Sequence, residues 1–170
     1  MPVKRGAGGK LQNYDSHGRY AKTNYSFLYE VKPSRKEKAR RKEEARRDAL
    51  YLRAKNSKDP YLLEVFLAIE KEMPGEVVSV NAIKEDCNNH QKREFDIITK
   101  KCIIEVKGGT EKNKTKQYFA QKRFAEEHRK DYIIIAPNMA YGTKKFLQNE
   151  GFHIVANTTD LIQEMKKGTK

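Results

Sequence analysis

The sequence predicts an α/β fold, a three-layer α/β sandwich with a mixed central sheet, preceded by a basic helical N-terminal extension. Three observations predict it. Two apolar runs rich in β-forming residues, 95–99 and 102–106, flank the polar pair Lys100-Lys101, which indicates an antiparallel hairpin. A continuous apolar run at 131–137 is typical of a strand buried on both faces and parallel to a neighbour. Helical patterns alternate with these strands, as expected for a layered α/β domain.

Length and charge narrow the classes of protein. A chain of 170 residues suits one domain of ordinary size plus a tail. Its 36 basic and 23 acidic residues leave a net charge of +13, which favours a polyanionic partner such as nucleic acid. No stretch approaches the roughly 18 apolar residues of a transmembrane helix, and no signal-peptide core is present, so no stable membrane insertion is expected. Cys87 and Cys102 suggest neither a metal cluster nor a disulfide framework.

The first 55 residues are expected to lie outside the main domain, which is assigned to 56–170. Residues 1–26 are Gly-rich and polar without a regular period, so they are interpreted as a flexible leader. Residues 32–55 hold 11 basic and 4 acidic residues, a net of +7, and Ser34 with Glu37 fits a helix-starting capping box. This helix is either a charged linker or an electrostatic arm on a phosphate backbone. The arginines proposed for the arm are Arg40, Arg41, Arg46 and Arg47.

A second helix and a first strand should follow. Asp59-Pro60 is an N-cap followed by proline at the first helical position, and the apolar residues after it continue to Pro74-Gly75. Their spacing gives a broad apolar face to pack against a sheet, with Glu64 among them. Residues 76–84 alternate well enough for a strand.

The hairpin sets ionisable residues opposite one another. With its turn on Lys100-Lys101, Asp96 falls opposite Glu105, and Lys107 shares their face because side chains alternate along a strand. Phe95 and Ile97 are expected together on the other face. Carboxylates directly opposite, with Cβ atoms about 4.5–5.5 Å apart, destabilise the pair unless a cation joins them. The alternative is an ordinary amphipathic hairpin with solvated charges.

A divalent cation would suit this arrangement. Mg²⁺ takes hard oxygen ligands from one or two carboxylates and keeps several waters. Lys107 would place an ammonium beside it, where the amine could hold or deprotonate an attacking water and offset developing charge.

Asp96, followed by Glu105-Val106-Lys107 at the end of an apolar strand, resembles the PD-(D/E)xK nuclease superfamily. The resemblance covers roughly residues 61–157, and Phe95 stands where the family's proline would be. It implies a restriction-endonuclease-like core and a metal-dependent nuclease. By this resemblance Asp96, Glu105 and Glu64 would bind Mg²⁺, Mn²⁺ or another divalent cation, and Lys107 would position the nucleophilic water.

The residues after Gly108-Gly109 extend the resemblance. Lys114 and Gln117 reproduce the Lys-x-x-Gln that often follows this strand in toxin members of the superfamily, which makes Gln117 a secondary catalytic candidate. With Lys116, Lys114 lies near a helix start, where both could face a phosphate or could be merely polar. A helix near 117–130 should follow, and after the strand at 131–137 a short helix at 143–149, a strand at 152–156 and a last helix at 158–167.

The resemblance also suggests a biological setting. A small, very basic nuclease domain looks like the C-terminal toxin domain of a polymorphic or contact-dependent growth inhibition system, with a cognate immunity protein as partner. It would be delivered from a secreted or surface-displayed parent protein and act in the cytoplasm of the target cell. DNA and tRNA are both substrates of resembling toxins, and DNA is slightly favoured. The alternative class is a non-catalytic basic nucleic-acid-binding or phage-related structural protein.

Overall fold

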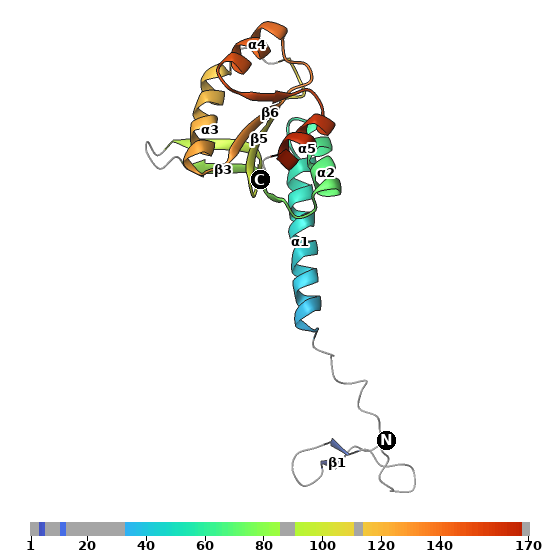
Figure 1. Ribbon diagram of the computed structural model, residues 1–170. Helices are drawn as coiled ribbons and strands as arrows, with labels where there is room; N and C mark the ends of the chain where they lie inside the picture. The colour runs from blue at the N-terminus through green and yellow to red at the C-terminus, as the bar shows by residue number, and fades with distance from the viewer. Residues whose placement is uncertain (1–3, 6–10, 13–32, 86–90, 111–113, 168–170) are drawn as a thin grey trace. The chain divides into compact units, whose positions relative to one another are not determined.

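The computed structural model describes residues 4–5, 11–12, 33–85, 91–110 and 114–167 (Figure 1). The chain divides into two compact units, Met1–Arg40 and Arg41–Lys170. In the first, strand β1 (Lys4–Arg5) pairs antiparallel with β2 (Leu11–Gln12). Most of the expected leader lies outside the described residues.

Helix α1 (Arg35–Lys55) begins in the first unit and continues into the second. Its start agrees with the expected capping box, since the Glu37 N–H donates to Ser34 Oγ at 3.1 Å. The division between units falls after Arg40 rather than after residue 55. The reason is that Leu50 and Ala54, near the end of α1, are buried in the core of the second unit.

The second unit is mixed α/β, with a five-stranded sheet in the order β3-β4-β5-β6-β7. β3, β4 and β5 are antiparallel neighbours, whereas β5, β6 and β7 run parallel. The expected mixed sheet is therefore confirmed, including the parallel pairing of the apolar run near residue 131. The strands are β3 (Val77–Glu85), β4 (Lys92–Thr99), β5 (Cys102–Val106), β6 (Asp131–Ile135) and β7 (His153–Val155).

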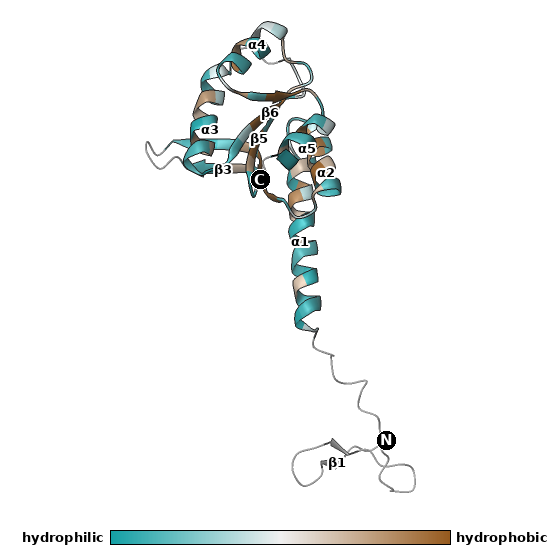
Figure 2. Cartoon of the chain, viewed as in Figure 1, coloured by the Kyte–Doolittle hydropathy of each residue, from teal (hydrophilic) through white to brown (hydrophobic). Residues whose placement is uncertain are grey.

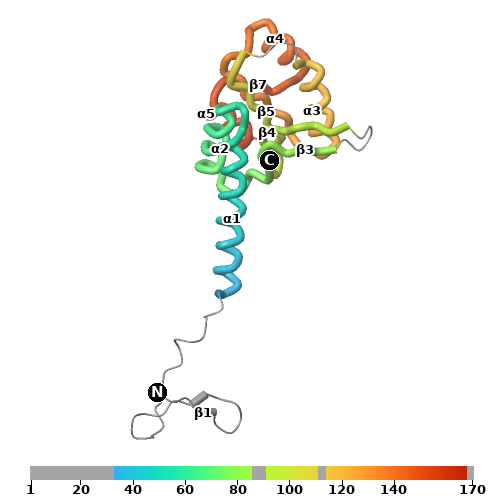
Figure 3. Tube along the Cα trace, turned by 180° about the vertical axis from the view of Figure 1, so that it is seen from behind, coloured from blue at the N-terminus to red at the C-terminus, as the bar shows by residue number. Residues whose placement is uncertain are grey.

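Helices cover both faces of this sheet (Figures 1 and 3). On one face, α2, α5 and the last turns of α1 enclose an apolar cluster that includes Val65, Ile104 and Leu161. On the other face, α3 and α4 enclose a second cluster that includes Phe124 and Leu147. These helices are α2 (Tyr61–Glu72), α3 (Thr115–Glu127), α4 (Tyr141–Asn149) and α5 (Thr158–Lys167).

The hydropathy of the elements follows this layering (Figure 2). The central strands β5 and β6 are apolar, and all five residues of β5 are buried. α1 is hydrophilic along most of its length. No helix in the described part of the chain is long and apolar enough to cross a membrane. Cys102 is buried with a free thiol, whereas Cys87 lies outside the described residues.

The β4–β5 hairpin has the expected register, with Ile97 paired to Ile104 and Ile98 to Ile103. The expectation that Phe95 would share the face of Ile97 is wrong. Phe95 lies in the cluster with Ile98, beneath α3, and its ring is tilted by 37° to the Phe124 ring at a centroid distance of 4.7 Å. The backbone departs from regular alternation here, because the β4–β5 ladder ends at Ile97 and the neighbouring strand holds Asn81 at φ 47°.

Candidate active site

Asp96 lies where β4 separates from β5. Its Oδ2 accepts the Val106 N–H at 2.7 Å, so a side-chain oxygen takes the place of the backbone acceptor that a continued ladder would supply. The side chain is 19% exposed. The irregular strand thus turns Asp96 into the gap between the two strands.

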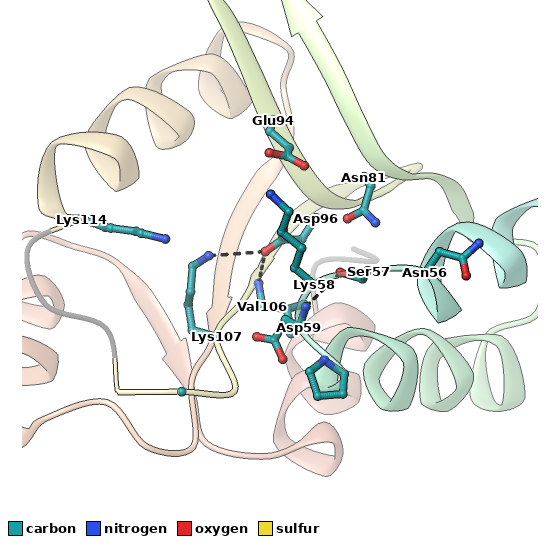
Figure 4. A pocket seen from close by; sticks show the side chains of 12 residues that line it. Asn56, Ser57, Lys58, Asp59, Asn81, Glu94, Asp96, Val106, Lys107 and Lys114 are labelled. Carbon is teal, nitrogen blue, oxygen red and sulfur yellow. Dashed lines mark hydrogen bonds and ion pairs between the residues drawn. The ribbon is translucent and has the colours of Figure 1, made fainter.

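Glu105 and Lys107 extend from the end of β5 beside it. The Lys107 Nζ lies 2.8 Å from Glu105 Oε1 and 3.9 Å from Asp96 Oδ2, and Figure 4 shows it directed at Asp96. The Glu105 side chain is only 2% exposed. The three residues of the motif therefore meet around one ammonium, as their spacing predicts.

Two glutamines of α3 hold the buried carboxylate. Gln117 Nε2 lies 3.4 Å from Glu105 Oε1, which places this predicted residue at the site. Gln121, which the sequence analysis missed, is 1% exposed and donates through Nε2 to Glu105 Oε2 at 3.0 Å and to the Glu94 carbonyl at 2.9 Å. Gln121 follows Gln117 by one helical turn, a spacing that puts both on one helix face and could have identified it.

Tyr132 sets the orientation of the Gln121 amide. Its hydroxyl donates to Gln121 Oε1 at 2.7 Å, so the amide NH₂ must point to Glu105. Burial raises the pKa of Tyr132 well above its ordinary value, which keeps the phenol protonated as a donor. Gln121 therefore joins the two separating strands, one through a side chain and the other through a backbone carbonyl.

Asp96 and Glu105 both have raised pKa values. Burial and then the neighbouring Asp96 raise the pKa of Glu105 from 4.5 to about 7, against the opposing effect of Lys107. Burial also raises the pKa of Asp96, while Lys107 and the Val106 N–H act in the opposite direction. One ammonium thus compensates the buried Glu105 and the partly buried Asp96 only in part, a pattern common at functional sites.

A cavity of about 650 Å³ opens beside this centre (Figure 4). Its walls carry the ammonium groups of Lys58, Lys107 and Lys114, which come from the loop before α2, the end of β5 and the start of α3. Three carboxylates also line it, those of Asp59, Glu94 and Asp96. The surface of the cavity is therefore densely charged with both signs.

Asp59 fixes one wall of the cavity, a role that its prediction as a helix N-cap did not include. Its Oδ1 accepts the Tyr61 N–H at 2.9 Å, and its Oδ2 accepts the Gly108 N–H at 2.8 Å. A Cβ on Gly108 would lie 2.8 Å from Asp59 Oδ1, so only glycine fits there without displacing this contact. The carboxylate therefore ties the start of α2 to the residue after Lys107.

Glu64, the expected third metal ligand, lies elsewhere. It is exposed on α2 and is not among the residues that line the cavity. The helix buries Val65, Phe66 and Ile69 against the sheet, so Glu64 falls on the outer face. Asp59, at the start of the same helix, is the carboxylate that this part of the chain brings to the cavity.

The basic candidates are divided in the same way. Lys114 lines the cavity, and Lys116 is exposed on α3. Arg40 and Arg41 are exposed on α1. Arg46 and Arg47, the other two arginines of the expected arm, bind residues nearer the core. Arg46 binds Glu43 and donates to the Val77 carbonyl at 2.6 Å, and Arg47 lies 3.2 Å from the buried Glu70.

The donors at the centre suit a divalent cation bound by two carboxylates. Within the residues that the structure describes, no group of three or more His, Cys, Asp or Glu side chains is arranged to hold a metal ion. Asp96 and Glu105 nevertheless place hard oxygens together with an excess of negative charge, and Mg²⁺ is often held by one or two carboxylates with waters in the remaining positions.

Searches against protein-family models, curated proteins and solved structures find no match to this chain. The resemblance to the PD-(D/E)xK superfamily therefore rests on the motif alone.

Proposed function

We propose that the protein is a metal-dependent nuclease that hydrolyses phosphodiester bonds, with DNA favoured over RNA as substrate. One observation carries the proposal. Lys107 bridges the buried Glu105 and the partly buried Asp96, and both Lys107 and Asp96 lie in the wall of an open cavity that other lysines also line. Two carboxylates and an ammonium at this spacing are the groups that metal-assisted phosphodiester hydrolysis requires.

Each residue has a role in this proposal. Asp96 and Glu105 would hold the divalent cation, which when bound supplies positive charge for the phosphate and acidifies a water. Lys107 would orient that water and offset charge as the phosphorus is attacked. Gln117 and Gln121 would hold Glu105 in place beside Lys107. The core around these residues would be restriction-endonuclease-like.

The alternative class is a non-catalytic basic nucleic-acid-binding or phage-related structural protein. It accounts for the net charge of +13 but not for the cluster of Asp96, Glu105 and Lys107. Burying Glu105 and partly burying Asp96 and Lys107 is unfavourable unless the groups are paired, and a protein that only binds phosphate gains little from it. The pair therefore favours catalysis over binding alone.

The proposed setting is that of a toxin domain, delivered into a target cell and inhibited by an immunity protein. It rests on the resemblance of the motif and on the basic composition. A tRNA-cleaving toxin of the same fold is the second candidate for the substrate.

A cleavage assay tests the proposal. The protein is incubated with plasmid DNA and with total RNA, each in Mg²⁺, Mn²⁺ or EDTA. The expected result is cleavage of DNA that requires the metal and disappears in Asp96→Asn/Glu105→Gln. Metal-dependent cleavage of RNA alone would support the tRNase candidate, whereas binding indifferent to chelator without cleavage would favour the non-catalytic class.

Metal binding can be measured without substrate. A ligand that binds only the native state stabilises it by about 2.7 kcal/mol at a hundredfold excess over Kd. Millimolar Mg²⁺ or Mn²⁺ should therefore raise the melting temperature of the wild type and not that of Asp96→Asn/Glu105→Gln. Equal shifts in the two proteins would show that these carboxylates are not the ligands.

A further inference from the structure

The loop at 56–60, between α1 and α2, is held rigidly against the end of β5. Ser57 Oγ accepts the Asp59 N–H at 3.3 Å within the loop. Asp59 in turn binds the Tyr61 N–H on one side and the Gly108 N–H on the other. The residue between Ser57 and Asp59 is thereby set at a defined place on the cavity wall.

That residue is Lys58, whose side chain extends into the cavity near Asp96 (Figure 4). Two of the three acids of the cavity have partners: both oxygens of Asp59 accept backbone N–H groups, and Asp96 Oδ2 accepts one while facing Lys107. The third, Glu94, is exposed on the same wall and forms no ion pair with Lys58. Among the described residues, Lys58 forms no hydrogen bond or ion pair with another side chain. Its ammonium is available to a ligand.

Lys58 and Lys107 differ in what they can do for a phosphate. Lys107 is 12% exposed and is held by the two carboxylates of the centre. Lys58 is exposed and comes from another segment of the chain. Next to it, the Ser57 hydroxyl accepts the Asp59 N–H and keeps its own proton to donate. An ammonium beside a hydroxyl donor matches the oxygens of a phosphodiester.

We propose that Lys58 and Ser57 form a phosphate subsite for the nucleotide next to the one that is cleaved. The inference rests on the proposed function and deepens it, because it specifies an internal phosphodiester, with a phosphate on the Lys58 side, as the substrate. The loop would fix the register of the strand in the cavity, and the centre around Lys107 would act on the adjacent phosphate.

Binding in EDTA tests the subsite without any chemistry. Fluorescence anisotropy is recorded for a labelled DNA duplex and an RNA of the same sequence, over a range of salt, with wild type, Lys58→Ala and Lys58→Arg. Loss of one phosphate contact should reduce the slope of log K against log salt by about 0.9 for duplex DNA and weaken binding roughly three- to tenfold. Lys58→Arg keeps the charge and should bind as the wild type does.

Lys71→Ala is the matched control, since Lys71 is also exposed but lies in α2 away from this cavity. It should leave affinity and salt slope close to those of the wild type. Equal effects of Lys58→Ala and Lys71→Ala would overturn the subsite and leave only general electrostatic attraction. The nucleic acid, DNA or RNA, whose affinity falls more in Lys58→Ala is the one that the subsite binds.

Cleavage kinetics separate the subsite from the proposed function. In Lys58→Ala the rise in KM for an oligonucleotide should exceed the fall in kcat, because the residue binds a phosphate that does not react. Cleavage by a wild type whose Lys58→Ala variant has an unchanged KM would refute the subsite and leave the nuclease proposal intact. A wild type that never cleaves but binds through Lys58 would refute the nuclease proposal and leave the subsite intact.

Discussion

The two ends of the β4–β5 hairpin satisfy their polar groups in different ways. At the turn, Thr99 Oγ1 accepts the Cys102 N–H at 2.8 Å and donates to the Cys102 carbonyl at 3.1 Å. Lys130 closes the same end by donating to the Thr99 carbonyl at 2.7 Å. The polar groups of the turn are therefore hydrogen-bonded to one another or to the partly buried Lys130 ammonium, without any ligand.

At the opposite end the ladder stops and charged side chains replace it. Asp96 takes a backbone N–H, Gln121 joins the two strands, and Glu105 is buried with a raised pKa. This end is less favourable by itself and, under the proposed function, would gain stability from a bound cation. The regular turn thus pairs its polar groups internally, whereas the separated end leaves charge that the proposed chemistry would use at a cost in stability.

The largest expected effect on cleavage is that of Lys107→Ala, compared with a lysine at the other end of the hairpin. Lys107→Ala should reduce cleavage by about 10²–10⁴-fold or more, since the ammonium acts on the attacking water. Lys107→Arg should also fail, because a planar fork replaces a compact ammonium. Lys101→Ala, at the exposed turn, is the control and should cleave as the wild type does. Cleavage of plasmid DNA by equal amounts of folded protein is measured, with circular dichroism as the folding check.

Wild-type activity in Lys107→Ala would show that the charged residues of the separated end take no part in cleavage. Loss of activity in Lys101→Ala would show that the turn takes part in the chemistry, and the contrast between the two ends would fail.

The second prediction concerns the pH dependence of stability without metal. The pKa of Glu105 in the folded state is raised to about 7 from 4.5, so its protonated form is favoured by folding. This contribution is fully present below pH 4.5 and is lost as pH rises through about 7. Relative to Glu105→Gln, the wild type should lose up to about 3 kcal/mol of unfolding free energy across this window.

Urea unfolding in EDTA at several pH values measures the difference. Glu64→Gln, which changes an exposed carboxylate of α2, is the control and should retain the wild-type dependence. If the wild type and Glu105→Gln have parallel profiles, the separated end is not the strained part of the hairpin.

The third prediction tests the clamp between the strands. Gln121→Met keeps the length of the side chain but removes its hydrogen bonds to Glu105 and to the Glu94 carbonyl. Residues that orient a metal ligand are typically worth 10–100-fold in activity or metal affinity, and a loss of about that size is expected in both. Gln117→Met removes only the longer, partly buried contact with Glu105 at 3.4 Å and should have a smaller effect. Cleavage rates and metal-dependent shifts in melting temperature are compared for the two variants. Equal effects would contradict a special role for Gln121 in joining the two strands.

The smallest expected change in activity belongs to the turn. Thr99→Val leaves the buried Cys102 N–H without its acceptor, which should cost about 1–3 kcal/mol of unfolding free energy. Cleavage per folded molecule should not change, because the separated end remains intact. Urea unfolding and cleavage assays on the same preparation measure both quantities. A variant of full stability and reduced activity would reverse the assignment of the two ends.

Local pattern was enough to predict the elements. The helix expected at 158–167 is observed as Thr158–Lys167, and the hairpin pairs Ile97 with Ile104 as its turn requires. Period and turn chemistry act over a few residues, so a single sequence contains them. Glu105 and Lys107 meet through the same alternation, whereas Asp96 reaches Lys107 from the gap where the β4–β5 ladder ends.

The rest depended on how distant segments pack. Glu64 and Asp59 are both acidic residues near the start of α2, but the buried face of the helix turns the first outward and leaves the second at Gly108. Gln121 reaches Glu105 only because α3 lies on that face of the sheet.

The order of the elements, the hairpin and its motif can thus be predicted from the chain alone. Which side chains complete the site, where the core begins within α1, and the packing of Phe95 beneath α3 rather than beside Ile97 depend on how the elements pack together. The physical reason is that backbone preference and alternation are properties of neighbouring residues, whereas the partner of a buried polar group is set by the three-dimensional packing of segments far apart in the chain.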